Sequence, residues 1–346
     1  MEPGAAAGVA RQYAHYARVW FPGHSPLYAQ WAAGVAADPG LTSLIATLPE
    51  PKRQPNLVFA SARFRGSGDA PFPEFAAFLR ERWDDVRSTA LRRRTQTNEP
   101  GRCATLLPAL ARVAERDGRP LALIEVGPSA GLCLLPDLYA YRYDDGPLLG
   151  AGRPVLRCRT SGAPPLPRAL PRVAWRAGVD LNPLDGTDPD TRRWLECLVW
   201  PGQDHRLAQL REALSTLRAT PEADRPQLVR GDLNERVAEL VGRVPPTARA
   251  VVFHSAVLAY LDPADRDRFA DTVRGLDCSW ISNENFFMDE ERGTVPAARE
   301  GYFTLALDGV PLAHAGQHGA ELHWLPGAGG AGASEAGAGG TGAGVA

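Results

Sequence analysis

The chain has 346 residues and a formal net charge of −2, with apolar and charged fractions of 44% and 23% that are ordinary for a globular protein. This length suits one large domain or two moderate ones, and the small net charge gives no electrostatic reason to expect a nucleic acid partner. Five cysteines without C-x-x-C spacing argue against a zinc ribbon, an iron–sulfur cluster or a disulfide framework, and favour a reducing cytoplasm. We expect neither a secretory signal nor a membrane span, because no segment has the required apolar run. Lys52 is the only lysine, which we interpret as a coding bias towards arginine.

Helical patterns fill the first third of the chain, and we expect a helical cap over residues 1–118. Ser25, followed by proline, predicts a capped helix that continues over residues 27–37. Thr97 and Asn98 can cap a later helix that leads to the first strand. No strand is expected before residue 120.

From residue 121, short apolar runs alternate with helical stretches, which predicts right-handed βαβ units and a mostly parallel sheet. Asp308-Gly309 is a hairpin signal, so the sheet is expected to close with an antiparallel pair. Residues 139–171 are rich in Gly, Pro and Arg and are interpreted as an insertion. The Gly/Ala tail over residues 326–346 is expected to be disordered. Strands are expected over 121–126, 173–179, 227–230, 248–254, 279–282 and 302–307, and helices over 192–197, 206–217, 234–241 and 263–276.

The first strand enters the tight turn Glu125-Val-Gly127-Pro-Ser129-Ala-Gly131. A strand, a turn of small residues and a helix start allow the backbone to approach a ligand closely, and a helix N-terminus favours an anionic group. Pro136 falls in the expected helix, where it would kink or end it. The same pattern is also compatible with an ordinary tight βα turn.

Acidic residues follow the next two strands. Asp180 ends the second, where a carboxylate can accept hydrogen bonds from ribose hydroxyls, and Asp232 follows the third, within reach of an adenine amino group. His254 ends the fourth strand; it could act as a general base, or simply be hydrogen-bonded in the core.

This series resembles motifs I to IV of class I S-adenosylmethionine (SAM) dependent methyltransferases. The resemblance implies a Rossmann-like α/β domain of class I methyltransferase type over residues 119–325. It also implies SAM as cofactor and methyl transfer to an unidentified small molecule. The implied cofactor-binding residues are Glu125, Gly127, Ser129, Gly131, Asp180 and Asp232.

Nearly the whole chain also resembles the DUF2332 family of uncharacterised bacterial proteins. The stretches that carry this resemblance are 96–99 (QTNE), 106–110 (LLPAL), 125–131 (EVGPSAG) and Trp200-Pro201. That family implies no established activity.

Two alternatives stay open. Residues 127–131 also read G-x-S-x-G, the nucleophile elbow of α/β-hydrolases, which would make Ser129 the nucleophile of a serine hydrolase. Only helices are expected before Ser129, however, whereas the hydrolase elbow follows several strands. The other alternative is a non-catalytic nucleotide-binding module of the same fold.

The acceptor pocket of a methyltransferase would have to be closed by the helical cap and by residues 139–171. Asn98 and Glu99 belong to the densest cluster of polar side chains in the cap and are candidate catalytic residues, with a helix cap as the alternative role for this cluster. His314, His318 and His323 lack a tight metal-ligand spacing, so no metal is expected. The expected partner is a small-molecule substrate, with neither nucleic acid nor membrane.

Overall fold

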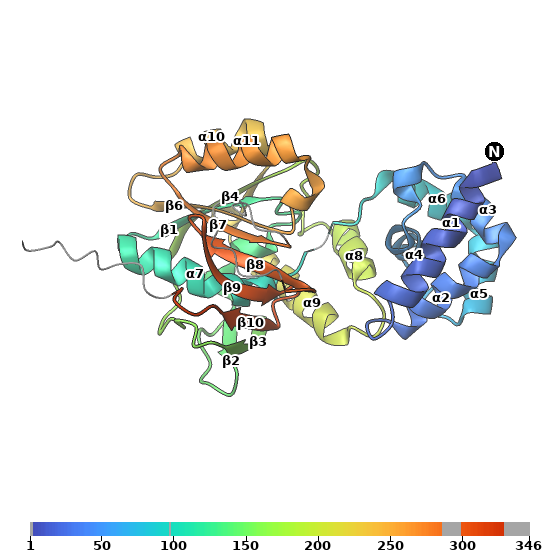
Figure 1. The fold of residues 1–346 in the computed structure, drawn as a ribbon, viewed down its shortest axis with the longest axis horizontal. Helices are drawn as coiled ribbons and strands as arrows, with labels where there is room; N and C mark the ends of the chain where they lie inside the picture. The colour runs from blue at the N-terminus through green and yellow to red at the C-terminus, as the bar shows by residue number, and fades with distance from the viewer. Residues whose placement is uncertain (1–2, 97, 286–298, 329–346) are drawn as a thin grey trace, which may run out of the picture.

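The computed structural model describes residues 3–96, 98–285 and 299–328. They form a group of helices beside an α/β region built on one ten-stranded sheet (Figure 1). Within these residues, no helix combines the length and apolar character that a membrane crossing requires.

The sheet is mixed but mostly parallel. Its strand order is β2-β3-β10-β9-β8-β7-β6-β1-β4-β5. The strands from β5 to β7 in this order are parallel, while β8, β9 and β10 form an antiparallel meander; β3 then pairs in parallel with β10 and with β2. The strand bounds are β1 Leu121–Val126, β2 Ala140–Tyr143, β3 Val155–Ser161, β4 Val173–Asp180, β5 Gln227–Arg230, β6 Arg249–Ser255, β7 Ser279–Glu284, β8 Tyr302–Leu307, β9 Val310–Gly316 and β10 Glu321–Trp324.

Numbered in chain order among themselves, the five parallel strands β5, β4, β1, β6 and β7 run 3-2-1-4-5, the order of a doubly wound sheet. From β1 the chain adds β4 and β5 on one side, and then crosses to add β6 and β7 on the other side. The strand order therefore reverses between β1 and β6, and ligands bind at the carboxyl ends of the strands at such a point.

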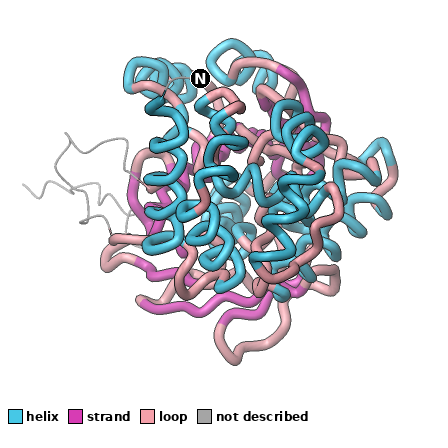
Figure 2. Tube along the Cα trace, turned by 90° about the vertical axis from the view of Figure 1, so that its right-hand side faces the viewer, coloured by secondary structure: helices cyan, strands magenta, loops and turns pink. Residues whose placement is uncertain are grey.

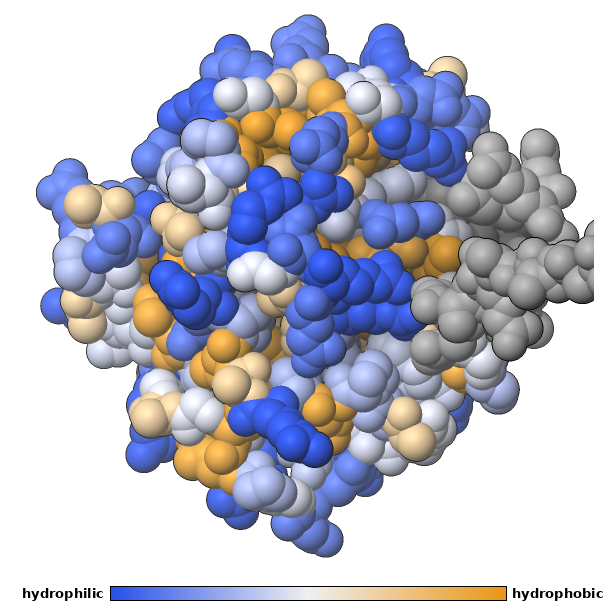
Figure 3. Space-filling view, turned by 90° about the vertical axis from the view of Figure 1, so that its left-hand side faces the viewer, coloured by the Kyte–Doolittle hydropathy of each residue, from blue (hydrophilic) through white to orange (hydrophobic). Residues whose placement is uncertain are grey.

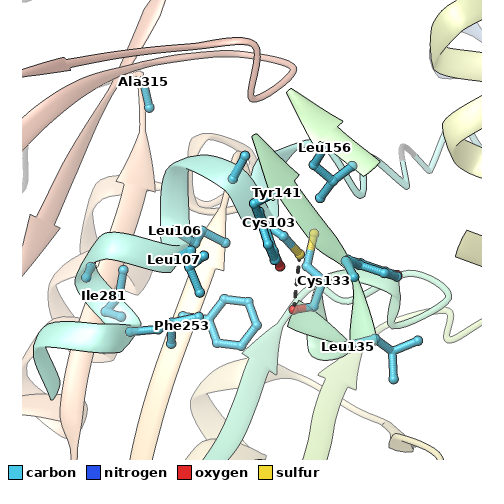
Figure 4. Close-up of a cluster of buried hydrophobic side chains, with 14 of the residues drawn as sticks. Cys103, Leu106, Leu107, Cys133, Leu135, Tyr141, Leu156, Phe253, Ile281 and Ala315 are labelled. Carbon is cyan, nitrogen blue, oxygen red and sulfur yellow. Dashed lines mark hydrogen bonds between the residues drawn. The ribbon is translucent and has the colours of Figure 1, made fainter. Parts of the chain in front are cut away.

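Helices cover both faces of the sheet, as Figure 1 shows. On one face lie α10 (Leu233–Gly242) and α11 (Pro263–Arg274), whose apolar side chains share a cluster with β1, β4 and β6. On the other face lie α7 (Arg102–Asp117) and α9 (Asp204–Ala219). In Figure 4, Leu106 and Leu107 of α7 lie near Phe253 of β6 and Ile281 of β7 in this second core.

The remaining helices form what we call the helical lobe, α1 to α6 and α8, which share an apolar cluster rich in aromatic rings that pack mostly edge-on or tilted. Figure 2 views the molecule from this side, with the helices in front of the strands. The helical lobe therefore excludes α7, although it precedes β1, and takes α8 from the connection between β4 and β5. The bounds are α1 Pro3–His15, α2 Pro26–Ala37, α3 Pro39–Ala46, α4 Pro55–Phe64, α5 Phe72–Glu81, α6 Trp83–Arg92 and α8 Pro189–Leu198.

Several local expectations are confirmed. The Ser25 side chain accepts a hydrogen bond from the Tyr28 backbone N–H (3.4 Å) at the start of α2. The six strands expected from apolar runs all form, and Asp308 and Gly309 turn between β8 and β9 with positive φ angles of 51° and 79°.

Two local expectations are corrected. No α-helix follows β1: two short 3₁₀ turns, Leu132–Leu134 and Pro136–Leu138, take its place. Residues 139–171, which the sequence analysis interprets as an insertion, lie between β1 and β4 and contribute β2 and β3 to the far edge of the sheet. Asn98 does not cap α7, which begins at Arg102; the other proposed cap, Thr97, lies outside the described residues.

The start of the Gly/Ala tail packs against α7. Ala328 is buried, and its carbonyl accepts a hydrogen bond from the Arg112 guanidinium (2.5 Å). Residues 329–346 of the expected disordered tail lie outside the described residues. On the face opposite the helical lobe, Figure 3 shows hydrophilic side chains interspersed with small hydrophobic areas.

The assignment of α8 to the helical lobe is testable through Trp194, which is 1% exposed and packs edge-on against Phe64 of α4. Trp194→Ala should lower the free energy of unfolding by about 3–5 kcal/mol, because it leaves a large cavity in that core. The matched control Trp20→Ala removes a side chain that is 52% exposed and should cost about 0.5 kcal/mol or less. Urea unfolding of both variants measures the difference, and equal losses would contradict the assignment.

Candidate functional site

A cavity of about 710 Å³ lies at the carboxyl ends of β1, β4, β5 and β6, between the sheet and the helical lobe. Its floor is formed by the turns that follow these strands. Its other wall lies on the side of the helical lobe and the start of α7, and consists of residues 51, 52, 54, 57, 94–96, 98, 99 and 102. The polar residues that line it are Lys52, Gln54, Arg94, Thr95, Gln96, Asn98, Glu99, Arg102, Glu125, Ser129, Asp180, Asn182, Asp232, Ser255 and Tyr260.

The turn after β1 is tied down by side chains from two other segments. Asp180 Oδ2 accepts a hydrogen bond from Ser129 N (2.9 Å), and Asn98 Oδ1 accepts one from Ala130 N (3.0 Å). The backbone N–H groups of Gly127 and Gly131 donate to the carbonyls of Val179 and Pro128. The turn therefore satisfies these four N–H groups internally and offers none of them to an anionic ligand.

Gly127 has a φ of +71°, and a Cβ there would lie 2.5 Å from Cγ2 of Val257. A side chain at this position would be strained and would displace the turn after β6. The glycine thus serves the close packing of two turns. This differs from the sequence interpretation, in which small residues leave room for a ligand.

Asp180 and Gln96 join the sheet to the helical lobe. Asp180 Oδ1 accepts from Asn182 N (2.7 Å). Gln96 makes two hydrogen bonds with Asn182. Asn182 Nδ2 donates to Gln96 Oε1 (2.6 Å), and Gln96 Nε2 donates to the backbone carbonyl of Asn182 (2.8 Å). Gln96 Nε2 also donates to Asp180 Oδ1 (3.4 Å). A carboxylate accepts about four hydrogen bonds, so Asp180, which already accepts from Ser129, Asn182 and Gln96, keeps about one acceptor position for a ligand.

Asn98 lies on the same side of the sheet as Gly127 and Asp180, as the acceptor-pocket hypothesis requires. Its side-chain amide donates to Ser129 Oγ and accepts from Ala130 N. These contacts give Asn98 a positioning role at the wall of the cavity.

Glu99 also reaches the cavity wall, but its carboxylate is already paired. The side chain is buried and accepts from Arg206 Nε (2.7 Å), while His318 Nδ1 lies 3.1 Å from Oε2. Burial raises the pKa of Glu99, but the His318 hydrogen bond and the Arg206 charge outweigh it and hold the pKa below its usual value. The geometry thus favours a fixed ion pair over the catalytic role expected for Glu99.

Glu125 is a buried acid of the cavity wall for which the described residues provide no ion-pair partner. Its side chain lines the cavity, is 6% exposed, and has no hydrogen-bond partner at Oε2 among the described residues. Burial raises the pKa of Glu125 well above its usual range; Cys133 and Asp180 add to the rise, and Arg102 opposes it. An unpaired buried carboxylate is costly in an empty pocket, and this cost would be relieved by a ligand that donates to it.

Asp232 caps α10 through one oxygen, since Oδ1 accepts from Asn234 N (2.8 Å). The residue lines the cavity beside Leu233. Its second oxygen makes no hydrogen bond within the described chain, so Asp232 can both cap the helix and accept from a ligand.

His254 does not line the cavity, which corrects its proposed role as general base. The ring is 0% exposed; Nδ1 lies 2.7 Å from Glu284 Oε1, and Nε2 accepts from Trp280 Nε1 (3.0 Å). Both ring nitrogens are occupied, so no position is left for a substrate proton. Glu284 also accepts from the backbone N–H groups of Val257 and Leu258 and thereby holds the turn after β6.

Ser129 has the positive φ (52°) that a tight turn imposes, but not the surroundings of a hydrolase nucleophile. Its Oγ bonds to Asn98, with no histidine partner in the described part of the chain. The Ala130 N–H, which would serve the oxyanion hole, donates to Asn98 instead. Likewise, no three His, Cys, Asp or Glu side chains in the described ranges cluster as metal ligands.

Sequence reasoning missed several residues of the cavity wall. Lys52, Arg94 and Arg102 line it, as does Tyr260, whose side chain is 89% exposed. The isolated lysine in an arginine-rich chain was the one available signal, and it does not by itself point to a site.

Fold and site together define a mixed α/β protein with a carboxylate-lined cavity at the carboxyl ends of a mostly parallel sheet. The chain belongs to the family described as uncharacterized protein conserved in bacteria (DUF2332), whose model matches residues 10–324. No curated protein matches the chain.

The raised pKa of Glu125 predicts a specific pH dependence. An acid whose pKa is higher in the folded than in the unfolded chain contributes stability below its unfolded pKa and loses it as pH rises through the folded pKa. Glu125→Gln removes this loss, so the variant should be more stable than the wild type at about pH 8, with a smaller difference at about pH 5. Chemical unfolding at both pH values tests this, with the exposed Glu74→Gln as control. A difference that does not grow with pH would contradict it.

Proposed function

We propose that the cavity binds SAM and that the protein transfers its methyl group to a small molecule. The observation that carries the proposal is the set of Glu125, Asp180 and Asp232, which end or follow three adjacent parallel strands and line one cavity. Strand order and cavity position agree with ligand binding at the switch point of a doubly wound sheet.

The charge of the site distinguishes between ligand classes. A dinucleotide would bring a pyrophosphate to the turn after β1, but the four N–H groups there are already bonded and the nearby side chains are acidic. SAM carries a single carboxylate in place of a pyrophosphate, and it also presents an ammonium group, a sulfonium, ribose hydroxyls and an adenine amino group. These donors and positive charges match carboxylates that have acceptor capacity.

Each carboxylate has a distinct place in this proposal. Glu125 would pair with the ammonium of the methionine part, which would favour the ionised form of its buried carboxyl group. Asp180 would accept from a ribose hydroxyl through its remaining acceptor position. Asp232 would accept from the adenine amino group through the oxygen that has no partner among the described residues. Bound SAM would supply an electrophilic methyl group.

The chain's own contribution would be positioning. Asn98 bonds to the turn after β1, and Gln96 bonds to the turn after β4. These bonds hold both turns against the helical-lobe side, which forms the cavity wall that an acceptor would contact. Holding acceptor and methyl group in line accounts for much of the rate enhancement in such reactions. Because His254 is withdrawn into the core, the proposal assigns no protein base.

SAM and its demethylated product should bind in calorimetric titrations. Glu125→Gln and Asp232→Asn should each weaken binding by about tenfold or more, since each removes a charge-assisted hydrogen bond. Asp232→Asn keeps a capping side chain on α10, so folding should be preserved. The control Asp267→Asn changes an exposed acid of α11 outside the cavity and should bind as the wild type does.

Absence of heat and of any thermal shift with both ligands in the wild type would refute SAM binding. Binding of SAM without methyl transfer to any acceptor class would instead support a non-catalytic module.

The hydrolase alternative requires Ser129 to be a reactive nucleophile, whereas the SAM proposal predicts that it is unreactive. Since Ser129 Oγ bonds to Asn98 and has no adjacent base, a fluorophosphonate probe should leave it unlabelled. Ser129→Ala should retain the fold and bind SAM within about threefold of wild type, because a single neutral hydrogen bond is lost. Stoichiometric labelling of Ser129, found by peptide mass spectrometry, would reverse the ranking.

A further inference from the structure

Two cations on the helical-lobe side of the cavity have no counterion among the described residues. Lys52 follows α3 in a short 3₁₀ turn, and Arg94 follows α6; both line the cavity. Neither makes an ion pair with any residue in the described part of the chain. The other cavity arginine, Arg102, donates to the carbonyls of Ser255 and Gln317.

The two charges are also close enough to disfavour one another. Burial lowers the pKa of Lys52, and the positive charge of Arg94 lowers it further, with no opposing acid in the described part of the chain. Holding two like charges together without a carboxylate costs stability, and a bound anion would relieve that cost.

The backbone around this pair is fixed. Lys52 Nζ donates to the Arg93 carbonyl (2.6 Å), and the buried Trp194 indole donates to the Arg94 carbonyl (3.1 Å). An ammonium has three N–H donors, so Lys52 keeps two for a ligand. Arg94 keeps its entire guanidinium fork, because none of its side-chain nitrogens has a partner among the described residues.

The charges of the cavity are therefore separated. Glu125, Asp180 and Asp232 lie at the strand ends, while Lys52 and Arg94 lie opposite them on the helical-lobe side. Glu99 also lies on that side, but its carboxylate is already paired with Arg206. A ligand set that fills both sides needs donors or positive charge at the sheet and a negative group at the lobe.

We propose that Lys52 and Arg94 form an oxyanion-binding subsite, and that the second ligand of the cavity is a small molecule with a carboxylate or phosphate group. Its role as methyl acceptor rests on the proposed function, whereas the anion subsite itself does not. An ammonium point charge beside a planar guanidinium fork suits either oxyanion.

The test titrates the full chain with inorganic phosphate and, separately, with acetate at constant ionic strength, followed by thermal shift and by ³¹P NMR for phosphate. Wild type should show saturable binding of at least one anion. Lys52→Gln and Arg94→Gln should each weaken it by about tenfold or more, and Lys52→Arg should largely restore it because the charge is kept. The matched control Arg92→Gln, exposed on α6 outside the cavity, should bind as wild type does.

The tighter anion assigns the ligand as a phosphate ester or a carboxylic acid, and either result supports the subsite. No saturable binding of either anion, or equal binding by wild type and both glutamine variants, overturns it. A parallel SAM titration separates the two proposals. If Lys52→Gln weakens SAM as much as the anion, the pair holds the cofactor's own carboxylate and the separate subsite is overturned. If wild type binds phosphate but not SAM, the proposed function fails and the subsite stands.

Discussion

The site depends on how the buried turn after β1 satisfies its backbone N–H groups. An unpaired buried N–H is costly, and without a following α-helix this turn needs acceptors from elsewhere. Asp180 supplies one to Ser129, and Asn98 supplies one to Ala130. Both acceptors come from distant segments, so the same bonds that satisfy the turn also join β1, β4 and the helical lobe around the cavity. The shape of the cavity is thus a consequence of backbone hydrogen bonding.

Charge is distributed unevenly over this frame. Glu99 is paired with Arg206 and hydrogen-bonded to His318, which makes it part of the structure. Glu125 is buried, and its Oε2 has no hydrogen-bond partner among the described residues. Buried charges are normally paired because desolvation is expensive. The half-buried Lys52 and the exposed Arg94 line the same cavity and form no ion pair within the described part of the chain. Glu125 and this pair of cations together point to ligands that complete the pairs.

The withdrawal of His254 shows how a polar residue at a strand end can serve the site indirectly. Glu284 bonds the imidazole and also the N–H groups of the turn after β6, whose Val257 packs against Gly127. This network fixes the turn after β6, which forms part of the cavity floor. It accounts for a buried carboxylate and histidine without assigning them any contact with substrate.

The sequence by itself determined six of the ten described strands and the four helices expected among them, with approximate bounds, because apolar periodicity, caps and the Asp308-Gly309 turn act over a few neighbouring residues. It also indicated that Asp180 and Asp232 follow parallel strands, and since such strand ends meet at one edge, that the two acids share a site. Only the tertiary structure decided that 139–171 joins the sheet and that α8 joins the helical lobe. It also turned His254 inward and brought Lys52 and Arg94 to the cavity. These outcomes depend on contacts between residues tens of positions apart, such as the bonds of Asn98 to residues 31 and 32 positions later, and no local pattern encodes such pairings.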